Sequence, residues 1–288
     1  MADRTTCMQI PLIQISDRVV MGGAEPVFLL GPCVMESEEF VWRMARDLRE
    51  IAQRAGVPLV FKASYDKANR TSHSSFRGMG CRAGCRLLGE VSRELGVPVL
   101  TDVHSPEEAE IAAETVDVLQ VPAFLCRQTD LIEAVAKSGR VVNVKKGQFL
   151  APWDVKPIAD KLRHFGNEAF FFTERGVTHG YNNLVADMRS LYWIREAGLR
   201  VVFDATHSVQ RPGGLGTASG GDGVLAPVLA RAAVAAGCDG VFMETHPNPG
   251  EALSDGPNQV PLDRLEALVR KLRAIHRLVR EDPAPLFA

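Results

Sequence analysis

The chain has 288 residues, of which 46% are hydrophobic and 24% charged, and its formal net charge at pH 7 is -2. This composition is typical of a globular protein with a large core and excludes a disordered chain. The balanced charge argues against a general nucleic-acid-binding protein. The sequence shows neither a run of 18 apolar residues nor a secretory signal peptide. We therefore expect a cytoplasmic protein that binds neither nucleic acid nor membranes.

The six cysteines are scattered through a chain that is too large to need disulfides. A reducing compartment would keep them as thiols, so each cysteine is interpreted from its own neighbours. Cys81 and Cys85 stand four residues apart at helical spacing, and Cys126 and Cys238 lie in apolar surroundings. We expect these four to be packing residues.

Residues 8–25 contain two short β-branched runs, IPLIQIS and RVV, which Gly22 and Gly23 separate from the rest of the chain. Such runs predict a small N-terminal β-hairpin. Its position before the first long strand would allow it to plug the bottom of a barrel.

A regular alternation runs from about residue 26 to residue 280: an apolar run, a polar loop, an amphipathic segment, a glycine and the next apolar run. The apolar runs are short and rich in Val and Phe, as expected of strands that are buried on both faces of a parallel sheet. The amphipathic segments show helical spacing, for example over 38–56. The eight predicted strands cover residues 27–33, 58–64, 98–104, 117–123, 141–147, 169–176, 201–207 and 240–246.

Local patterns mark the ends of the predicted helices. Ser105 and Glu108 have the spacing of a capping box, and Pro106 stands at the first helical position between them. A glycine ends each of six helices just before the next strand. These glycines are Gly56, Gly96, Gly139, Gly166, Gly198 and Gly237.

Eight strand-helix units predict a (β/α)8 TIM barrel as one domain over residues 1–288. The alternative is an open doubly wound sheet, but no GxGxxG or P-loop pattern follows any of the predicted strands. The stretch GGLGTASGG at 213–221 has the glycines but lacks the P-loop lysine. We expect it to be a flexible loop over the site.

The stretch 61–80, FKASYDKANRTSHSSFRGMG, follows the second predicted strand with almost no further apolar residues. Its two lysines, two arginines and short hydroxyl and amide side chains are suited to hold phosphate or carboxylate oxygens. Taken alone, the stretch could also be a solvated basic loop. The other strand ends favour a binding site, because TIM barrels place their reactive groups at the carboxyl ends of the strands.

One group of residues at those strand ends is suited to bind an anion. Lys62, Lys145 and Arg175 are cations near the carboxyl ends of the second, fifth and sixth predicted strands. We expect them to converge on one small polyanion, with Gln120 and the backbone near Ala123 as neutral donors.

A second group is suited to bind a metal. Cys33, His207, Glu244 and Asp255 follow the first, seventh and eighth strands, which are neighbours in a closed barrel. One thiolate, one imidazole and two carboxylates suit one divalent transition metal such as zinc, iron(II) or manganese. The alternative for Cys33 is an inert core residue. His246 is expected to be a loop histidine or one that supports the cluster without binding the metal itself.

Eight motifs occur in order between about Phe28 and the last predicted helix: FKASYDKANRTS, TDVH, LQVPAFLCRQTDL, NVKKGQF, GYNNLVADMRSL, FDATHSVQ, METHPNP and LSDGPNQ. Together they closely resemble the 3-deoxy-D-manno-octulosonate 8-phosphate synthases. That family has a (β/α)8 barrel with an N-terminal hairpin, and the resemblance implies a homotetramer. It also implies condensation of phosphoenolpyruvate with arabinose 5-phosphate and water, which releases phosphate in lipopolysaccharide biosynthesis.

The resemblance assigns roles to individual residues. Lys62, Lys145, Arg175 and Gln120 would hold phosphoenolpyruvate, while Lys67 would lie between the two substrates. Of the residues named so far, those expected to act in catalysis are Lys67, Cys33, His207 and Asp255.

For the second substrate, the resemblance assigns Asn69, Arg70 and Thr71 to the pentose and its phosphate. Arg70 and Thr71 would lie near a subunit interface and reach into the adjacent site. Relatives often carry serine in place of Thr71, and the hydroxyl is kept.

The family has metal-dependent members with cysteine after the first strand and metal-independent members with asparagine there. Cys33 in GPCVMES, together with His207, Glu244 and Asp255, matches the metal-dependent class.

Three alternatives remain open from the sequence. The related heptulosonate 7-phosphate synthases, which use erythrose 4-phosphate, typically carry a KPR-type motif where this chain has KANRT at 67–71. A metal aldolase or hydrolase could use the same barrel. A catalytically idle binding protein should have lost some of the cations or metal ligands, and all of them are present.

Overall fold

The computed structural model describes residues 10–70, 72–213 and 220–281. Thr71 lies outside the described residues, as do Cys7 and the start of the predicted hairpin. The same holds for residues 214–219 of the glycine-rich stretch, so the expected flexible loop is not tested there.

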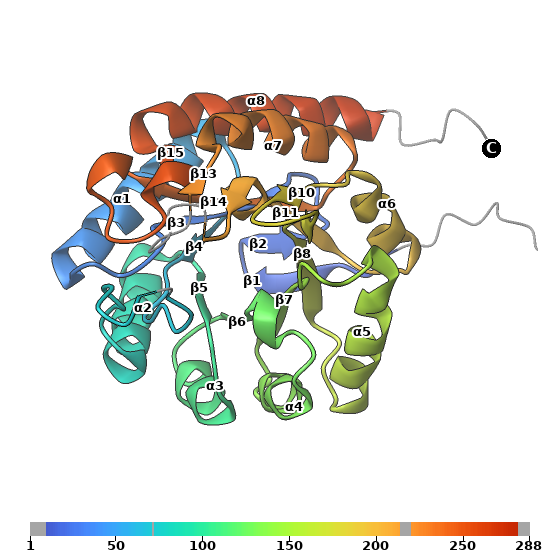
Figure 1. Cartoon of the computed structure of the whole chain (residues 1–288), viewed down its shortest axis with the longest axis horizontal. Helices are drawn as coiled ribbons and strands as arrows, with labels where there is room; N and C mark the ends of the chain where they lie inside the picture. Colours follow the sequence, from blue (N-terminus) through green and yellow to red (C-terminus); the bar gives the residue numbers. More distant parts are fainter. Residues whose placement is uncertain (1–9, 71, 214–219, 282–288) are drawn as a thin grey trace, which may run out of the picture.

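Eight parallel strands form a closed barrel (Figure 1). The ring closes because β14 pairs with β3 on one side and with β11 on the other. The prediction of a (β/α)8 barrel with eight strands is therefore confirmed, and the open sheet is wrong. In ring order the strands are β3 (Val27–Gly31), β4 (Leu59–Lys62), β5 (Val99–Asp102), β6 (Val118–Val121), β7 (Val141–Lys145), β8 (Phe170–Glu174), β11 (Val201–Asp204) and β14 (Gly240–His246).

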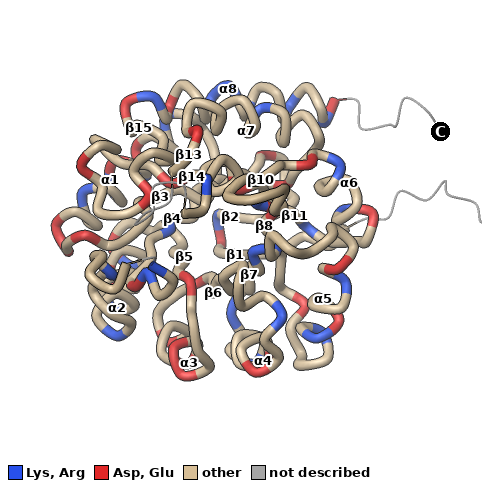
Figure 2. Tube along the Cα trace, in the orientation of Figure 1, with Lys and Arg blue, Asp and Glu red and all other residues tan. Residues whose placement is uncertain are grey.

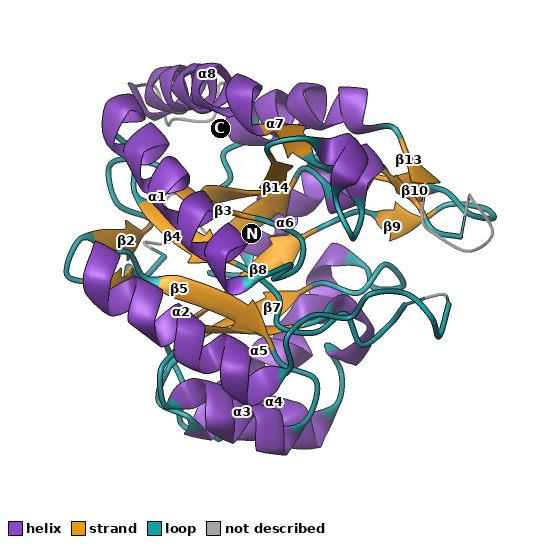
Figure 3. Ribbon diagram, turned by 90° about the vertical axis from the view of Figure 1, so that its left-hand side faces the viewer, coloured by secondary structure: helices purple, strands orange, loops and turns teal. Residues whose placement is uncertain are grey.

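A helix follows each barrel strand, and the helices surround the barrel (Figures 1 and 3). None of the helices in the described part of the chain is long and apolar enough to cross a membrane. Both basic and acidic residues are spread over the outer helices as a set (Figure 2), in agreement with the small net charge. The helices are α1 (Glu38–Ala55), α2 (Cys81–Leu95), α3 (Pro106–Ala113), α4 (Thr129–Lys137), α5 (Val155–His164), α6 (Arg189–Glu196), α7 (Ala226–Ala235) and α8 (Leu262–Glu281).

Strand side chains pack alternately outside and inside the barrel. Phe28 and Leu30 belong to a cluster with the outer helices, whereas Val27 and Leu29 belong to a separate cluster inside the barrel. Because successive residues of a strand point to opposite faces, a strand with both faces buried needs an unbroken apolar run. This is the physical reason for the Val- and Phe-rich pattern in the sequence.

The N-terminal hairpin closes one end of the barrel. It consists of β1 (Ile13–Ser16) and β2 (Val19–Met21), which pair antiparallel. Its apolar side chains, including the fully buried Met21, pack in the cluster inside the barrel, so the prediction that the hairpin plugs the bottom is confirmed.

At the other end lie short strands that the sequence did not predict. Figure 3 shows β2 near one end of the barrel, and β9, β10 and β13 at the opposite end. These strands are short segments of the loops that follow barrel strands. Their bounds are β9 (Val177–Thr178), β10 (Leu184–Val185), β12 (Gln210–Arg211), β13 (Gly220–Gly221) and β15 (Val260–Pro261).

The predicted helix ends agree with the structure except for one half of the capping box. All six glycines that were expected to end helices have positive φ, as the left-handed end of a helix requires. Ser105 Oγ accepts from the backbone N–H of Glu108 at 3.3 Å. The Glu108 carboxylate does not return to Ser105 and instead accepts from Tyr65 and His104. Tertiary partners therefore replace the second, local bond of the box.

Glu25 joins the end of the hairpin segment to the last helix. Its carboxylate accepts two hydrogen bonds from the Arg273 guanidinium, at 2.8 and 3.0 Å, and two from Arg277. The bond from Arg273 is the main cause that lowers the pKa of Glu25, and partial burial opposes it. The network fixes the entry to β3 against α8.

We predict that Glu25→Gln lowers the free energy of unfolding by about 1 kcal/mol at pH 7, because the amide loses the charged bonds. A carboxyl with a lowered folded pKa stabilises the fold above its unfolded pKa near 4.5, and this stability is lost as the pH falls through the folded value. Urea unfolding between pH 7 and pH 3 checks this. The exposed Glu110→Gln is the control, and a difference that does not shrink as the pH falls below 4.5 would contradict the prediction.

Candidate active site

The carboxyl ends of the barrel strands open into a cavity of about 1650 Å³. Most of the residues that the sequence assigned to the site line this cavity, although they come from six different strands and their loops. Those that line it are Lys62, Lys67, Asn69, Arg70, Gln120, Ala123, Lys145, Arg175, His207, Glu244 and Asp255.

Two buried lysines lie at the bottom of the cavity. Lys62 Nζ contacts Glu244 Oε1 at 3.0 Å and donates to Ser64 Oγ at 2.9 Å. Lys145 Nζ lies 2.7 Å from Asp204 Oδ2 and 4.1 Å from the centre of the Phe242 ring. Burial lowers the pKa of Lys145, and Asp204 opposes this effect. An anionic ligand would stabilise both ammonium groups.

Arg175 is buried with one of its donors unused. Its Nη2 donates to Gln210 Oε1 at 2.6 Å, whereas its buried Nη1 has no hydrogen-bond partner among the described residues. Burial lowers the pKa of Arg175. Because an unpaired buried guanidinium N–H is unfavourable, this donor marks a place where an anionic oxygen would bind.

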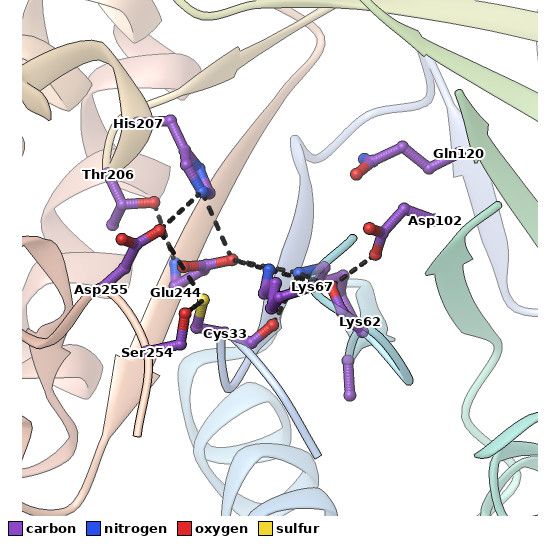
Figure 4. Close-up of polar contacts among 12 residues, drawn as sticks. Cys33, Lys62, Lys67, Asp102, Gln120, Thr206, His207, Glu244, Ser254 and Asp255 are labelled. Atoms are coloured by element: carbon purple, nitrogen blue, oxygen red, sulfur yellow. Dashed lines mark hydrogen bonds and ion pairs between the residues drawn. The ribbon is translucent and has the colours of Figure 1, made fainter. Parts of the chain in front are cut away.

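The second predicted group also comes together. The ligand atoms of Cys33, Glu244 and Asp255 all lie within 4.8 Å of one another. His207 Nε2 lies 3.6 Å from Glu244 Oε1 and 3.8 Å from Asp255 Oδ2 (Figure 4). The other ring nitrogen, Nδ1, lies 2.8 Å from Asp204 Oδ2. A carboxylate that binds Nδ1–H leaves Nε2 free to accept, which is the usual arrangement of a metal-ligating histidine.

The charges of this cluster favour a bound cation. Burial, and then the charge of Glu244, raise the pKa of the Cys33 thiol well above its usual range. Burial would also raise the pKa of Glu244, but His207 and Lys62 lower it far below the usual value. A buried thiol beside two carboxylates releases its proton when a metal ion neutralises the thiolate. The donor set therefore fits a divalent metal.

The loop after β4 runs along the wall of the cavity. Lys67 Nζ lies 3.1 Å from Ser64 Oγ and 3.8 Å from Glu244 Oε1, between the cation group and the cluster. Arg70 donates to Leu253 O at 3.2 Å and to Ser254 Oγ at 2.6 Å, so it lies against the loop after β14 of its own chain. The described residues do not test a contact with another subunit.

Three neutral residues that the sequence did not single out, Gln210, Ser254 and Asn143, hold site residues in place. Gln210 accepts from Arg175 and donates to Asp255 Oδ2 at 3.0 Å, which couples the two groups. The Cys33 thiol lies 3.1 Å from Ser254 Oγ. Gln120 Nε2 donates to Asn143 Oδ1 at 2.6 Å. The motifs FDATHSVQ and LSDGPNQ contain two of these residues, but neutral side chains in loops gave no separate indication.

Lys146, Glu174 and His246 also stand at strand ends, and they lie outside both groups. Lys146 is fully buried and donates to Leu150 O, and its Nζ lies 3.5 Å from Glu174 Oε2. His246 was expected in a loop, but it is the last residue of β14, buried against Phe40, and its Nδ1 accepts from the backbone N–H of Asn248.

A closed β/α barrel with buried cations and a thiol, imidazole and carboxylate cluster in one cavity defines an enzyme that acts on small anionic substrates. The family model described as "DAHP synthetase I family" matches residues 9–281 of this chain. The chain therefore belongs to this family.

Similar proteins of known name indicate which enzyme of this family the chain resembles. A "2-dehydro-3-deoxyphosphooctonate aldolase" of Acidithiobacillus ferrooxidans (strain ATCC 53993 / BNL-5-31) is 59% identical over 265 residues, which cover 92% of this chain and 94% of the relative. Proteins of the same name from Azoarcus sp. (strain BH72) and Burkholderia orbicola (strain MC0-3) are 59% and 58% identical, over 90% and 91% of this chain and 94% and 95% of theirs. That name denotes the 3-deoxy-D-manno-octulosonate 8-phosphate synthases, which confirms the resemblance seen in the motifs.

We predict that Gly31→Ala displaces the site and lowers stability. A Cβ at Gly31 would lie 1.7 Å from the carbonyl oxygen of Lys62, so β3 and β4 would have to separate. Such overpacking lowers the free energy of unfolding by about 3 kcal/mol. Denaturant unfolding measures the loss. The control is Gly250→Ala, whose Cβ would meet its nearest atom at 3.5 Å, and equal stabilities of the two variants would contradict the prediction.

Proposed function

We propose that the chain catalyses the condensation of phosphoenolpyruvate with arabinose 5-phosphate and water. The products are 3-deoxy-D-manno-octulosonate 8-phosphate and phosphate, for lipopolysaccharide biosynthesis in the cytoplasm. The observation that carries the proposal is the buried, unpartnered Nη1 of Arg175, which lies in the same cavity as Lys62 and Lys145. The names of the relatives favour this reaction over the one with erythrose 4-phosphate.

Lys62, Lys145, Arg175 and Gln120 are the proposed binding residues for phosphoenolpyruvate. Three cations can neutralise its phosphate and carboxylate, and Gln120 adds a neutral donor. This matters because the second substrate is also an anion. Neutralisation and fixed orientation replace a repulsive encounter between two anions in water.

Lys67, Asn69, Arg70 and Thr71 are the proposed binding residues for arabinose 5-phosphate, with the backbone near Ala123 on the opposite wall. Asn69 and Arg70 line the cavity beside Lys67, which supports this assignment. Among the described residues, the partners of Arg70 are neutral oxygens of the loop after β14, so its charge is available for a phosphate.

The reaction joins C3 of the enol to the aldehyde carbon of the pentose, and the aldehyde oxygen takes a proton. Water adds to C2 of the former enol, and the C–O bond to phosphate then breaks. The ammonium of Lys67 lies between the two proposed substrate sites, where it can hold the developing negative charge on the aldehyde oxygen.

One divalent transition metal, such as zinc, iron(II) or manganese, is the proposed cofactor. Cys33, His207, Glu244 and Asp255 would hold it, and when bound it would supply a Lewis acid in the cavity. Asp204 orients the His207 ring for this role, and Lys62 holds the Glu244 carboxylate. With Lys67, the residues Cys33, His207 and Asp255 are the proposed catalytic group.

A homotetramer is the proposed assembly, with Arg70 and Thr71 near a subunit interface. Large aromatic side chains are exposed on adjoining elements: Phe149 is 58% exposed after β7, Trp153 62% before α5 and Trp193 47% on α6. Exposed aromatic groups that lie close together are typical of a surface that another chain covers.

We predict that the protein releases phosphate from phosphoenolpyruvate with arabinose 5-phosphate at least about tenfold faster than with erythrose 4-phosphate. A difference of this size corresponds to about 1.4 kcal/mol of binding in the transition state. Chelator should abolish the activity, and added zinc, iron(II) or manganese should restore it. Equal rates with both sugars would contradict the substrate assignment. Unchanged activity after verified removal of metal would contradict the cofactor.

We predict that Cys33→Ala loses bound metal and most of the activity, because the cluster keeps no sulfur ligand. Cys33→Asn should lose metal and retain some metal-free activity, because relatives without metal carry asparagine there. Metal analysis and phosphate release measure the two effects in parallel. Cys238→Ala, which alters a buried thiol outside the cavity, is the control. Full metal content in Cys33→Ala would contradict the assignment.

A further inference from the structure

Glu108, in the first turn of α3, does not line the cavity but contacts a residue that does. Its Oε2 accepts from Tyr65 Oη at 2.8 Å and from the backbone N–H of His104 at 2.8 Å. The same oxygen lies 3.0 Å from Nδ1 of the His104 ring. His104 itself lines the cavity. One carboxylate oxygen therefore holds both the backbone and the ring of His104.

A continuous set of hydrogen bonds leads from this ring to the site. His104 Nε2 lies 3.2 Å from Asp102 Oδ2, and Ser64 Oγ donates to Asp102 Oδ1 at 2.5 Å. Ser64 Oγ accepts from Lys62 Nζ at 2.9 Å and from Lys67 Nζ at 3.1 Å. A hydroxyl donates once and accepts twice, so all bonds of Ser64 are used. Asp102 thereby turns both lone pairs of this hydroxyl toward the two lysines.

The chemistry of the partners fixes the charge of the His104 ring. Both ring nitrogens face a carboxylate, and an ionised carboxylate can only accept. Two donated bonds require a proton on each nitrogen, so the ring is an imidazolium. Burial would lower the pKa of His104, but Asp102 and Glu108 raise it. Burial would raise the pKa of Asp102, but His104 and Lys62 lower it well below the usual range.

Aromatic and helical neighbours of the ring add rigidity. The Tyr65 ring meets the His104 ring edge-on, with centroids 5.7 Å apart, and Tyr65 is fully buried. A Cβ at Gly84 of α2 would lie 2.4 Å from the Tyr65 side chain, so the helix presses closely on this residue. Cys81 of α2 lies 4.0 Å from the backbone oxygen of Glu108. Glu108 and Tyr65 therefore restrict rotation of the His104 ring.

We propose that Glu108 is a positioning residue for the reaction. It fixes the His104 imidazolium, which orients Asp102 and Ser64 and so keeps Lys62 in the phosphoenolpyruvate site and Lys67 between the two substrates. Glu108 touches neither substrate. Tyr65 supports Glu108 through one of the three hydrogen bonds on Oε2. This inference rests on the proposed condensation.

The test is Glu108→Gln in the metal-loaded enzyme. The amide has nearly the same volume and removes the charge. We expect kcat to fall about 10- to 100-fold, as for other residues that orient a catalytic group. Without Glu108 the imidazolium loses its proton at lower pH, so the alkaline limb of the kcat profile should move about one pH unit toward acid. Tyr65→Phe removes one of three bonds and should show a smaller change in the same direction.

Glu110→Gln, on the exposed side of the same helix, is the matched control and should keep the kcat and pH profile of the wild type. A wild-type kcat and profile in Glu108→Gln would overturn the proposal. A lower kcat with an unmoved profile would also overturn it, because a merely structural defect reduces the amount of active enzyme without changing its titration.

Nitrogen NMR of the His104 ring in the wild type gives an independent answer if Glu108→Gln does not fold. The resonances are assigned by their loss in His104→Asn. An imidazolium at pH 7 supports the proposal, and a neutral ring at pH 7 overturns it. If the wild type releases no phosphate with arabinose 5-phosphate, the proposed function fails, while the ring measurement still reports on Glu108.

Discussion

Lys62 and Glu244 form an ion pair at 3.0 Å inside the barrel, and their side chains are only 2% and 1% exposed. Removing two charges from water is unfavourable by several kcal/mol unless further partners stabilise them. Here Ser64 and the backbone oxygen of Cys33 complete the bonds of Lys62, while Lys67 and His207 lie within 4 Å of Glu244. The cation group and the cluster around Cys33 therefore share one electrostatic centre.

The closed barrel makes this centre possible. Strands from distant parts of the chain bring their carboxyl ends to one opening, and the hairpin closes the other end with apolar side chains. The hairpin excludes water from its end of the barrel, and this strengthens the electrostatic interactions at the open end. The close approach of β3 to β4 at Gly31 sets where Lys62 emerges relative to Cys33. Small changes in strand packing are thus transmitted directly to the charges of the site.

Charge and periodicity allowed the sequence to predict much of this arrangement. Strands buried on both faces need unbroken apolar runs, so a lysine or glutamate that ends such a run is conspicuous, as Lys62 and Glu244 are. Neutral connectors do not stand out in this way. Ser64 and Gln210 resemble ordinary loop residues until the fold places them between charged groups. Glu108 had the spacing of a capping box, but tertiary partners compete with the local bond, and here Tyr65 and His104 took its place.

The sequence by itself determined the eight strand-helix units, the N-terminal hairpin and the set of residues at the strand ends, because apolar periodicity and glycine positions are local properties of the chain. Only the tertiary structure decided which of those residues meet. Lys62 and Lys67 share Ser64, Gln210 joins Arg175 to Asp255, and Lys146 turns away toward Glu174. Such pairings depend on strand register and on the direction of each side chain across the barrel, and no local pattern specifies them.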